Sequence, residues 1–560
     1  MAKADTGAGV KAPRTLLHSA GLVGLMTLTS RLTGLAVQRM IASRLGLSDV
    51  SDAYQIAYRL PNMLRRFTAE GTMTAAFLPT LIGIDTEGGH DKAKSFVADF
   101  FGATLAILLG ICTVGVLLMT PITGLLMLGK LAPGADFTSQ LGILWDVLNG
   151  NSPLPTNVAL SAKLGRIMFP YLLLVSVTSA MAAVLNMRHR FVLAASTNIC
   201  GNLVFIGLSM TAFHYMSQPS GERAATVFAC AMLLHGLVQV LALAPVFKRL
   251  GFDFGWLSRF ARFGSPDVKL ALRRMLPGIL AGGIHPINVL VSQSLASQLE
   301  PGAQTVLANS NLFGELVLGL FAVSVATVSL PMMSRQASEG NLDAVRSSYS
   351  EALRGMGLLA IPSAFGMAAL AAPIVALVYQ NGLFGASAVA WTAKTLPYQL
   401  FGLIFIASAR ISTQALNAMK DYRGPALAAL VGFVFNVCLS LALMKPMGTN
   451  GMALANSLAA VAGLGFQLWR LKHTLGRLPI AGVADGWLRM AAAAALMGLA
   501  AWSAAWMVGI QDPTSFRGAT LTGLRLFPII ALSGTLYFGL ATLFRVPEAR
   551  ALAKRFASRW

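Results

Sequence analysis

The sequence predicts an all-α polytopic membrane protein, and two features carry that prediction. Of the 560 residues, 55% are hydrophobic and 12% are charged, and the mean hydropathy is +0.66. A soluble globular protein carries about 25% charged residues. The apolar runs are longer than the ~7–15 residues of a secretory signal core, and they recur to the C-terminal end. We therefore expect a series of membrane-spanning helices.

Fourteen apolar runs are long enough to span a membrane, because a helix crosses the hydrocarbon layer with about 20 residues. Their centres lie near residues 30, 65, 110, 175, 203, 235, 283, 320, 365, 403, 433, 460, 498 and 535. The second run is the weakest, since the polar stretch LPNMLRR (60–66) interrupts it. The short basic segment at residues 1–15 is expected to be a cytoplasmic tail.

Lysine and arginine alternate between the connecting segments, which predicts the orientation. These residues concentrate on the cytoplasmic side of membrane proteins. The connections expected outside hold few of them: Arg44, Lys130, Arg223, Lys445, Arg517 and Arg525. The other connections and the basic tail at 546–560 hold most of the rest, so both termini are expected in the cytoplasm. The net charge of +21 follows largely from this alternation, which also favours contact with anionic membrane lipids.

The connections also indicate how the spans are grouped. The stretches VLNMRHRF (184–191) and LNAMKDYRGP (416–425) each separate two long spans and suggest two related six-helix halves. We expect an N-terminal lobe over 16–250 and a C-terminal lobe over 265–480. Spans thirteen and fourteen, over 485–545, would form an additional pair of helices.

The motifs of several other protein classes are missing from the sequence. It has no phosphate-binding loop, no GxSxG and no GxGxxG followed by a suitable acidic residue, and its connections are too short for a soluble catalytic domain. The seven histidines lack the spacing of a metal site, and the four cysteines lie singly in apolar runs. Soluble basic patches with aromatic partners, which favour nucleic-acid binding, are also missing. We therefore expect no enzymatic activity, cofactor, metal or nucleic-acid partner.

Charged residues in and around the expected spans are the candidate functional residues. A charge in the hydrocarbon layer is costly, so it usually faces a water-filled cavity or a partner. The candidates are Arg31 and Arg39 in the first span, Asp52, Arg59, Arg65, Arg66 and Glu70 around the second, Arg166 in the fourth, Glu315 in the eighth and Arg410 in the tenth.

For several of these charged side chains, the sequence allows two different locations in the folded protein. Arg31 follows about fifteen apolar or small residues, so its side chain cannot easily reach water, and we expect it in a cavity. Arg65 and Arg66 either line that cavity or cap the span at the membrane surface, with Glu70 as a helical partner. For Arg410, a cavity position and a salt bridge inside the bundle fit the sequence equally well.

Arginine indicates the class of ligand. Its planar fork binds phosphate or carboxylate oxygens with two hydrogen bonds, and it stays charged when it is removed from water. Several arginines that face one cavity therefore predict an anionic substrate, most naturally a phosphate or a diphosphate. Pro61 removes a backbone donor and is expected to break or bend the second span beside them, as in the broken helices of transporters.

Eight short stretches carry a resemblance to a known family. They are SRLTG (30–34), SDAY (51–54), LPNMLRRFTAEG (60–71), FLP (77–79), FPYLLL (169–174), VLNMRHRF (184–191), SLPMMS (329–334) and MKDYRGP (419–425). These stretches resemble the signature of the MurJ (MviN) lipid II flippases of the MOP exporter superfamily. The match extends over most of the chain, and the expected fourteen helices agree with the family.

The resemblance implies a bundle of two lobes around a cationic central cavity, in the inner membrane. Members of the family carry the undecaprenyl-diphosphate-linked disaccharide-pentapeptide, lipid II, from the inner to the outer leaflet. They do so by alternating access, without ATP and in dependence on the membrane potential, and the two additional helices form a groove for the lipid tail. Lipid II, membrane lipids and proteins of cell-wall synthesis are the implied partners.

The family pattern also assigns roles to individual positions. Its Ser-Arg pair in the first span falls on Ser30 and Arg31. The asparagine and first arginine of its second-span motif fall on Asn62 and Arg65. The expected substrate-binding residues are Ser30, Arg31, Arg39, Asn62, Arg65 and Arg66. The expected gating or charge-pair residues are the family's acidic positions Asp52 and Glu315, together with Arg59, Glu70 and Arg410.

Two departures from the family pattern leave other functions open. Many members have a second first-span arginine and an arginine three residues before the eighth-span glutamate, and the positions here are Val37 and Leu312. Arg39 lies ~200° around a helix from position 37, so it replaces the first of these charges only if the span rotates or bends. The alternatives are an exporter of another polyprenyl-linked saccharide or small molecule, and an inactive membrane scaffold for cell-wall synthesis.

Overall fold

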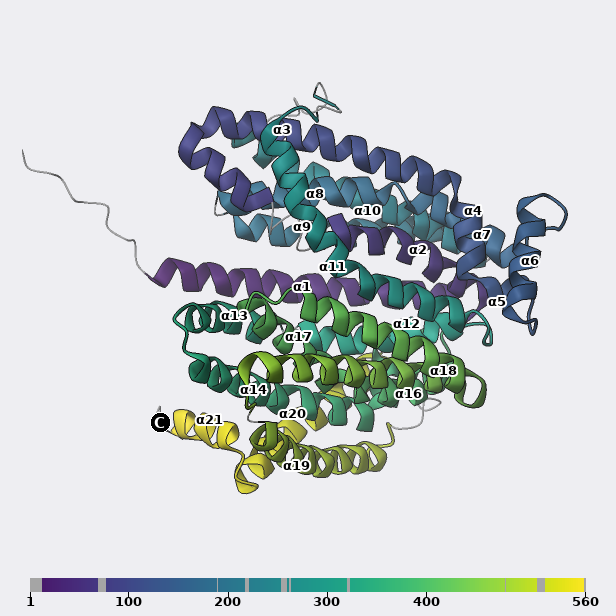
Figure 1. The fold of residues 1–560 in the computed structure, drawn as a ribbon. Helices are drawn as coiled ribbons and strands as arrows, with labels where there is room; N and C mark the ends of the chain where they lie inside the picture. Colours follow the sequence, from purple (N-terminus) through teal and green to yellow (C-terminus); the bar gives the residue numbers. More distant parts are fainter. Residues whose placement is uncertain are drawn as a thin grey trace, which may run out of the picture. The chain divides into compact units, whose positions relative to one another are not determined.

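The structure is a computed structural model that describes residues 13–68, 77–188, 190–216, 221–252, 259–260, 263–319, 323–478, 480–510 and 519–557. Apart from one isolated bridge between Asn381 and Phe384, all regular structure in these ranges is helical (Figure 1). This confirms the predicted all-α fold. The contacts between residues divide the chain into two compact units, each of which has its own core.

Unit 1 comprises Met1–Met40, Ala57–Met119 and Lys163–Ile279. Its helices are most of α1 (Pro13–Leu45), the second half of α2 (Asp49–Thr68), α3 (Leu78–Leu117), the end of α7 (Thr156–Met168), α8 (Tyr171–Met187), α9 (Phe191–Tyr215), α10 (Gly221–Arg249) and the first part of α11 (Pro266–Ala296). Aromatic side chains fill its core. Phe77 stacks on Phe100 with ring centroids 4.5 Å apart, and Phe101 stacks on Phe247 at 5.7 Å, which joins α3 to α10.

The helices of unit 1 approach one another closely at glycines. A Cβ atom at Gly236 on α10 would lie 2.7 Å from the Tyr171 ring of α8. A Cβ at Gly201 on α9 would lie 2.5 Å from the His235 ring of α10. Helices pack in lipid through such small residues, because burial of apolar surface adds little there. The positions of α8, α9 and α10 are therefore tightly specified.

Unit 2 comprises Ile41–Ile56, Thr120–Ala162 and Leu280–Trp560. Besides the ends of α1, α2, α7 and α11, it contains α4 (Met119–Leu126), α5 (Leu128–Leu131), α6 (Phe137–Leu148), α12 (Ala303–Val317), α13 (Val323–Ser338), α14 (Leu342–Ala369), α15 (Ala371–Tyr379), α16 (Ala386–Phe401), α17 (Leu403–Ala418), α18 (Arg423–Leu475), α19 (Ile480–Met507), α20 (Ala519–Leu543) and α21 (Pro547–Ala557). Helices α14 to α17 share a core around the buried Tyr349 and Tyr379. Helix α19 packs on α14, where Gly357 leaves room for the Trp487 ring.

Helix α18 holds two of the expected spans without a loop between them. It has 53 residues, and only Gly448, with φ 56° and ψ −133°, leaves the helical conformation. Two helices therefore meet at this glycine, which supplies the positive φ that other residues avoid.

Nine helical segments in the described part of the chain are long and apolar enough to cross a membrane. They are Leu78–Leu117, Thr156–Met187, Phe191–Tyr215, Gly221–Arg249, Leu342–Ala369, Ala386–Ala418, Arg423–Leu475, Ile480–Met507 and Leu521–Leu543. Helix α2 misses this set because it carries five charged residues, and α12 misses it because it has only 15 residues. The chain is therefore a multi-pass membrane protein, and the count of fourteen spans stays a prediction.

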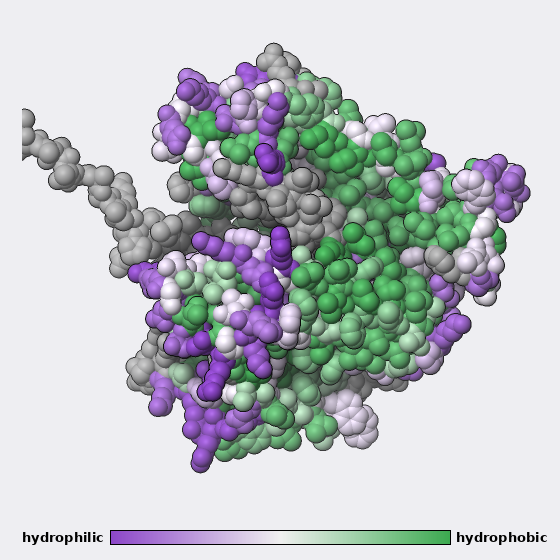
Figure 2. Space-filling view, viewed as in Figure 1, coloured by the Kyte–Doolittle hydropathy of each residue, from purple (hydrophilic) through white to green (hydrophobic). Residues whose placement is uncertain are grey.

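Large apolar side chains cover the outer surface of the helices. Leu203 on α9, Leu241 on α10 and Trp506 on α19 are more than half exposed. On the face of unit 2 in Figure 2, hydrophobic residues cover the middle of the helices and hydrophilic residues gather toward their ends. Apolar surface on this scale indicates contact with lipid rather than with water.

Candidate functional site

The start of α2 is built to hold a carboxylate inside the protein. Gly46 turns the chain after α1 with a φ of +60°, and Ser48 precedes the new helix. The backbone N–H of Ser51 donates to Ser48 Oγ at 3.2 Å, and the N–H of Ser48 donates to Ser51 Oγ at 2.9 Å. This reciprocal capping satisfies donors that the first turn of a helix leaves unpaired. It fixes the turn that carries Asp49 and Asp52.

Asp52 is completely buried, and its carboxylate accepts three hydrogen bonds from the start of α12. The N–H groups of Gly302 and Thr305 donate at 2.8 and 3.0 Å, and the Thr305 hydroxyl donates at 2.8 Å. A helix N-terminus stabilises an anion, because its N–H groups are unpaired and its dipole is positive there. Gly302 has a φ of +93°, and a Cβ there would lie 2.8 Å from Leu47. The contact between α2 and α12 therefore requires glycine at this position.

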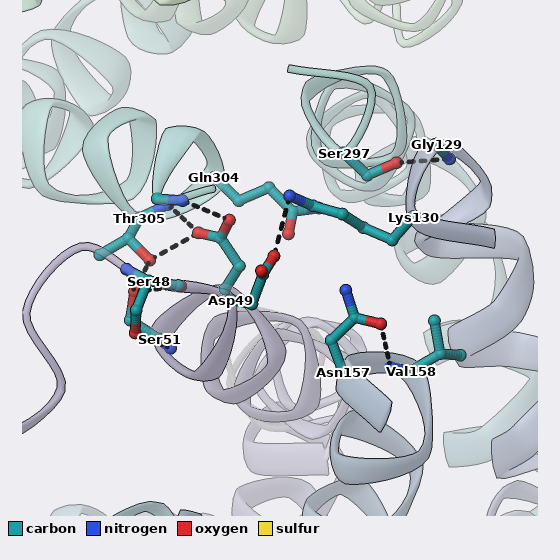
Figure 3. Close-up of polar contacts among 12 residues, drawn as sticks. Ser48, Asp49, Ser51, Gly129, Lys130, Asn157, Val158, Ser297, Gln304 and Thr305 are labelled. Atoms are coloured by element: carbon teal, nitrogen blue, oxygen red, sulfur yellow. Dashed lines mark hydrogen bonds and ion pairs between the residues drawn. The ribbon is translucent and has the colours of Figure 1, made fainter. Parts of the chain in front are cut away.

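Helix α5 adds a second connection to the same turn (Figure 3). Lys130 Nζ lies 3.0 Å from Asp49 Oδ1, and the lysine side chain is only 8% exposed. The neighbouring Gly129 donates its N–H to Ser297 Oγ at 3.1 Å, and a Cβ at Gly129 would lie 2.5 Å from the backbone of Gln298. Helix α5 is therefore held between the start of α2 and the end of α11.

The end of α1 is held in the same unit. The N–H of Leu383, in the connection between α15 and α16, donates to the carbonyl oxygen of Ser43 at 2.8 Å. We call the set Asp49, Asp52, Lys130, Gly302 and Thr305 the Asp52 network. All of its bonds are polar contacts between helix ends of unit 2.

The expected substrate-binding residues on α1 and α2 belong to unit 1. Ser30, Arg31 and Arg39 lie on α1, whereas Asn62 and Arg65 lie on α2. All five are half-buried. Arg59, from the expected gating set, is also half-buried on α2. Arg66 is in α2 as well, but its side chain and the whole of Glu70 lie outside the described residues.

Helix α2 continues through Pro61, so the expectation of a break in the second span is wrong, and the alternative of a bend stays a prediction. The helix runs from Asp49 to Thr68 with Pro61 inside it. A proline removes one backbone hydrogen bond, and spans in a membrane tolerate this where neighbouring helices surround the site. Pro61 is buried in the structure. The residues Arg59, Asn62 and Arg65 are therefore spaced as on a continuous helix.

Glu315 and Arg410 lie in unit 2. Glu315 Oε1 accepts a hydrogen bond from Asn311 Nδ2 at 3.4 Å, one turn earlier on α12. The Arg410 side chain is exposed on α17. Leu312, which replaces a family arginine, packs against the core of unit 2. The structure thus places the expected substrate-binding residues in unit 1 and the acidic candidates Asp52 and Glu315 in unit 2.

Sequence reasoning did not identify the partners of Asp52. In the sequence, Lys130 stands out only as one of the few basic residues in the connections expected outside, and Gly302 and Thr305 lie in no motif. The signal that the sequence offers is a glycine directly before a helix whose first turn holds Gln304 and Thr305. In the described ranges, no group of three or more His, Cys, Asp or Glu side chains could hold a metal ion.

Comparisons with known proteins give one consistent result. The family model described as "Lipid II flippase MurJ" matches residues 41–514. A protein of Rhizobium meliloti (strain 1021) named "Probable lipid II flippase MurJ" is 30% identical over 543 residues, which cover 94% of each chain.

Solved structures show the same fold. The structure titled "Lipid II flippase MurJ, inward closed conformation" has a TM-score of 0.68 and 21% identity, and the match covers 95% of this chain and 99% of that one. A multidrug resistance MATE transporter of the MOP superfamily, in an inward-facing conformation, has a TM-score of 0.59 and 14% identity. That match covers 79% of this chain and 98% of the transporter.

Proposed function

Because the chain belongs to the MurJ family of lipid II flippases, we propose that it carries lipid II from the inner to the outer leaflet of the inner membrane by alternating access. The observation that carries this proposal is the family match over residues 41–514. It includes Asp52, Asn62 and Arg65, which stand at the family's signature positions. The family is one of transporters, so we propose that the chain changes no covalent bond in its substrate.

The arginines of unit 1 are the proposed binding groups for the lipid diphosphate. Arg31, Arg39 and Arg65 are each half-buried. A charge-assisted contact between arginine and phosphate is stronger in such a place than in bulk water. Ser30 directly precedes Arg31 on α1, and Asn62 lies three residues before Arg65 on α2. Their hydroxyl and amide groups can donate to phosphate oxygens. Arg66 is the further cation of the proposed set.

The Asp52 network is the proposed gate at the outer end of the transporter. Alternating access requires one end of the helices to close while the other is open. The network binds the start of α2 to α12 and to α5 through a buried carboxylate and an ion pair. Opening would exchange these bonds for water, so the two states can differ little in free energy. Arg59, Glu70, Glu315 and Arg410 are the other proposed gating or charge-pair residues.

The alternation of lysine and arginine between the connections supports the proposed orientation, with both termini in the cytoplasm. We propose an N-terminal lobe over 16–250, a C-terminal lobe over 265–480 and a tail-binding pair over 485–545.

Helices α19 and α20 expose large apolar side chains such as Leu499, Trp502 and Phe527. Such a surface suits a polyprenyl chain as well as ordinary lipid tails. Contacts with cell-wall synthesis proteins are proposed from the family alone.

If the chain binds a diphosphate without the two family arginines, another charge must compensate for them, and Arg39 is the proposed one. Position 37 is valine, and position 312 is a leucine that packs in the core of unit 2. If Arg39 compensates, Arg39→Ala abolishes function, and Val37→Arg in that background restores part of it. Growth of the Arg39→Ala strain at the rate of the parent would show that the chain uses fewer arginines.

Complementation tests the proposed function. The chain is expressed in a bacterium whose own lipid II flippase is depleted, and growth is measured. We expect growth with the parent chain and none with Arg31→Ala, while immunoblots of membranes show equal protein. No growth with a correctly inserted parent chain would reject lipid II transport.

A second candidate function, an inactive scaffold for cell-wall synthesis, is favoured by the two missing arginines. A scaffold needs the fold but not the binding groups. It would therefore support growth only in a strain that keeps another flippase, and Arg31→Ala would behave like the parent. The same set of strains separates the two functions.

A further inference from the structure

Helix α9 contacts α1 directly beside Arg31. Asn202 Nδ2 on α9 donates to Thr33 Oγ1 at 2.9 Å and to the carbonyl oxygen of Ser30 at 3.3 Å. These two acceptors flank Arg31 in the sequence. One amide group of α9 therefore holds the turn of α1 that carries the arginine.

The Thr33 hydroxyl has a defined direction in this contact. Its Oγ1 donates within α1, to the carbonyl oxygens of Ser30 at 3.0 Å and Thr29 at 3.1 Å. Its hydrogen is thus used inside its own helix, and its lone pairs accept from Asn202. The contact depends on this one geometry, because a rotation of α1 moves both acceptors away from the amide.

Helix α9 is itself fixed by α10. Asn198 lies one turn before Asn202, on the same side of the helix, and its Oδ1 accepts a hydrogen bond from Gln239 Nε2 at 2.9 Å. Gln239 is buried, and it lies one turn after His235, whose ring fits against Gly201 of α9. The two asparagines of α9 thus connect α1 to the tightly packed pair α9 and α10.

We propose that Asn202 is a positioning residue for the substrate diphosphate: it sets the rotation of α1, and thereby the direction of the Arg31 guanidinium. A rotation of about 20° moves a group ~9 Å from the helix axis by about 3 Å. A two-pronged arginine–phosphate contact needs its geometry within about 0.5 Å. Loss of the Asn202 contact therefore weakens binding even though the helices stay packed. The inference rests on the proposed function, because it assumes that Arg31 binds the substrate.

The test measures the affinity of the purified full-length protein for lipid II in detergent micelles. Thr33→Val keeps the shape of the side chain and removes its hydroxyl, and Asn202→Leu removes the donor. Each variant is expected to bind lipid II about fivefold more weakly. The double variant should bind no more weakly than Asn202→Leu alone, because Asn202→Leu already removes the bond to Thr33. Thr33→Ser keeps the hydroxyl and is expected to bind like the parent.

A matched control lies on α16. The Thr395 hydroxyl is buried and contacts Thr449 Oγ1 and Asn450 Oδ1 of α18, both at 3.0 Å. Thr395→Val removes a similar contact between helices, but from a helix without a proposed site residue, so lipid II affinity should not change. A loss equal to that of Thr33→Val would mean that any such bond lowers affinity, and would overturn the inference.

The decisive comparison is made in the Arg31→Ala background. If Asn202 acts through Arg31, Thr33→Val has no further effect on affinity there. An equal loss with and without Arg31 would show a general structural role and reject positioning. If Arg31→Ala binds like the parent, the assumption from the proposed function is the part that fails.

A second measurement does not depend on the substrate. Arg31→Cys is made in a chain whose four cysteines are replaced by alanine, and its reaction rate with a charged methanethiosulfonate is followed. Asn202→Leu should change that rate by about threefold or more, whereas Thr395→Val should leave it unchanged. An unchanged rate with Asn202→Leu overturns the inference whatever the protein transports.

Discussion

The two halves of α2 use charge in opposite ways. Residues 49–56 belong to unit 2, and there Asp52 is buried with three hydrogen bonds from α12. Residues 57–68 belong to unit 1, and there Arg59 and Arg65 are half-buried cations. One continuous helix thus carries a buried carboxylate and, two turns later, the half-buried cations that we propose as binding or gating groups.

This difference separates two tasks that a transporter must combine. A buried carboxylate at a helix start holds a conformation, and its removal should change stability and the balance of states. A half-buried arginine that binds a substrate should affect function while the fold persists. Substitutions in the two halves should therefore give different phenotypes.

The largest effect is expected in the second half of α2. Arg65→Ala should abolish growth under flippase depletion, because the substrate anion loses its paired cation. Arg65→Lys should support only partial growth, because an ammonium group lacks the planar fork of arginine. Thermal unfolding of the purified variant should match the parent. A folded Arg65→Ala protein that supports full growth would remove Arg65 from the binding set.

Asp52→Asn in the first half should act mainly on the fold. An asparagine either places its NH2 group against the N–H groups of α12 or accepts hydrogen bonds with only one oxygen. We therefore expect the free energy of unfolding to fall by about 1–3 kcal/mol. Scanning fluorimetry of the purified protein measures this loss. Asp49→Asn is the control, since that side chain is 45% exposed. Equal melting temperatures for Asp52→Asn and the parent would contradict the role assigned to the buried contact.

Lys130→Met tests the second connection to the same turn. Asp49 is 45% exposed although Lys130 is only 8% exposed, so water can hydrate the freed carboxylate and the loss of the ion pair should cost about 1 kcal/mol. Because the Asp49 end of the pair is open to salt, the difference between Lys130→Met and the parent should shrink in 1 M salt. A larger loss that salt does not change would mean that the lysine acts by packing instead.

The smallest effect is expected at Asp421, a carboxylate that also meets a helix start. Its Oδ2 accepts from Arg470 Nε at 2.7 Å, and its Oδ1 accepts from the N–H of Gly424 in α18 at 3.0 Å. The hydrogen bond from Arg470 is the main cause that lowers the pKa of this carboxyl, which lies in the connection between α17 and α18.

A lowered pKa means that the ionised carboxyl stabilises the folded state. That stability is fully present above the ordinary pKa of about 4 and is lost as the pH falls through the lowered value. The melting temperature of Asp421→Asn should therefore lie slightly below that of the parent from pH 7 to about pH 4, and the difference should shrink at lower pH. A difference that grows on acidification would reverse the sign and reject this role.

Several features of the fold follow from local sequence patterns, and physical reasons explain which features these patterns cannot predict. The apolar runs locate membrane helices, because each span must be apolar over a fixed length. The stretch MKDYRGP is explained by the contact of Asp421 with Arg470 and with the start of α18. In unit 1, Arg188 of VLNMRHRF pairs with Asp85 at 2.9 Å. Both motifs anchor helix ends.

The partners of Asp52 could not be predicted in the same way. Asp52 and Thr305 are 253 positions apart, and no local pattern links residues at that distance. Pro61 shows the opposite limit. Its local preference predicts a break, but the buried surroundings of α2 keep the helix continuous. Local rules thus fail where contacts distant in sequence decide the outcome.

At Gly448, the number of residues in the chain determines how the following helix is rotated about its axis. The two spans within α18 meet at this single residue. One extra or missing residue in a helix turns everything beyond it by about 100°. Elsewhere a surface connection absorbs such a change by bulging outward. Here an insertion or deletion would redirect every side chain of the following span, so this bend should tolerate substitution more readily than any change in length.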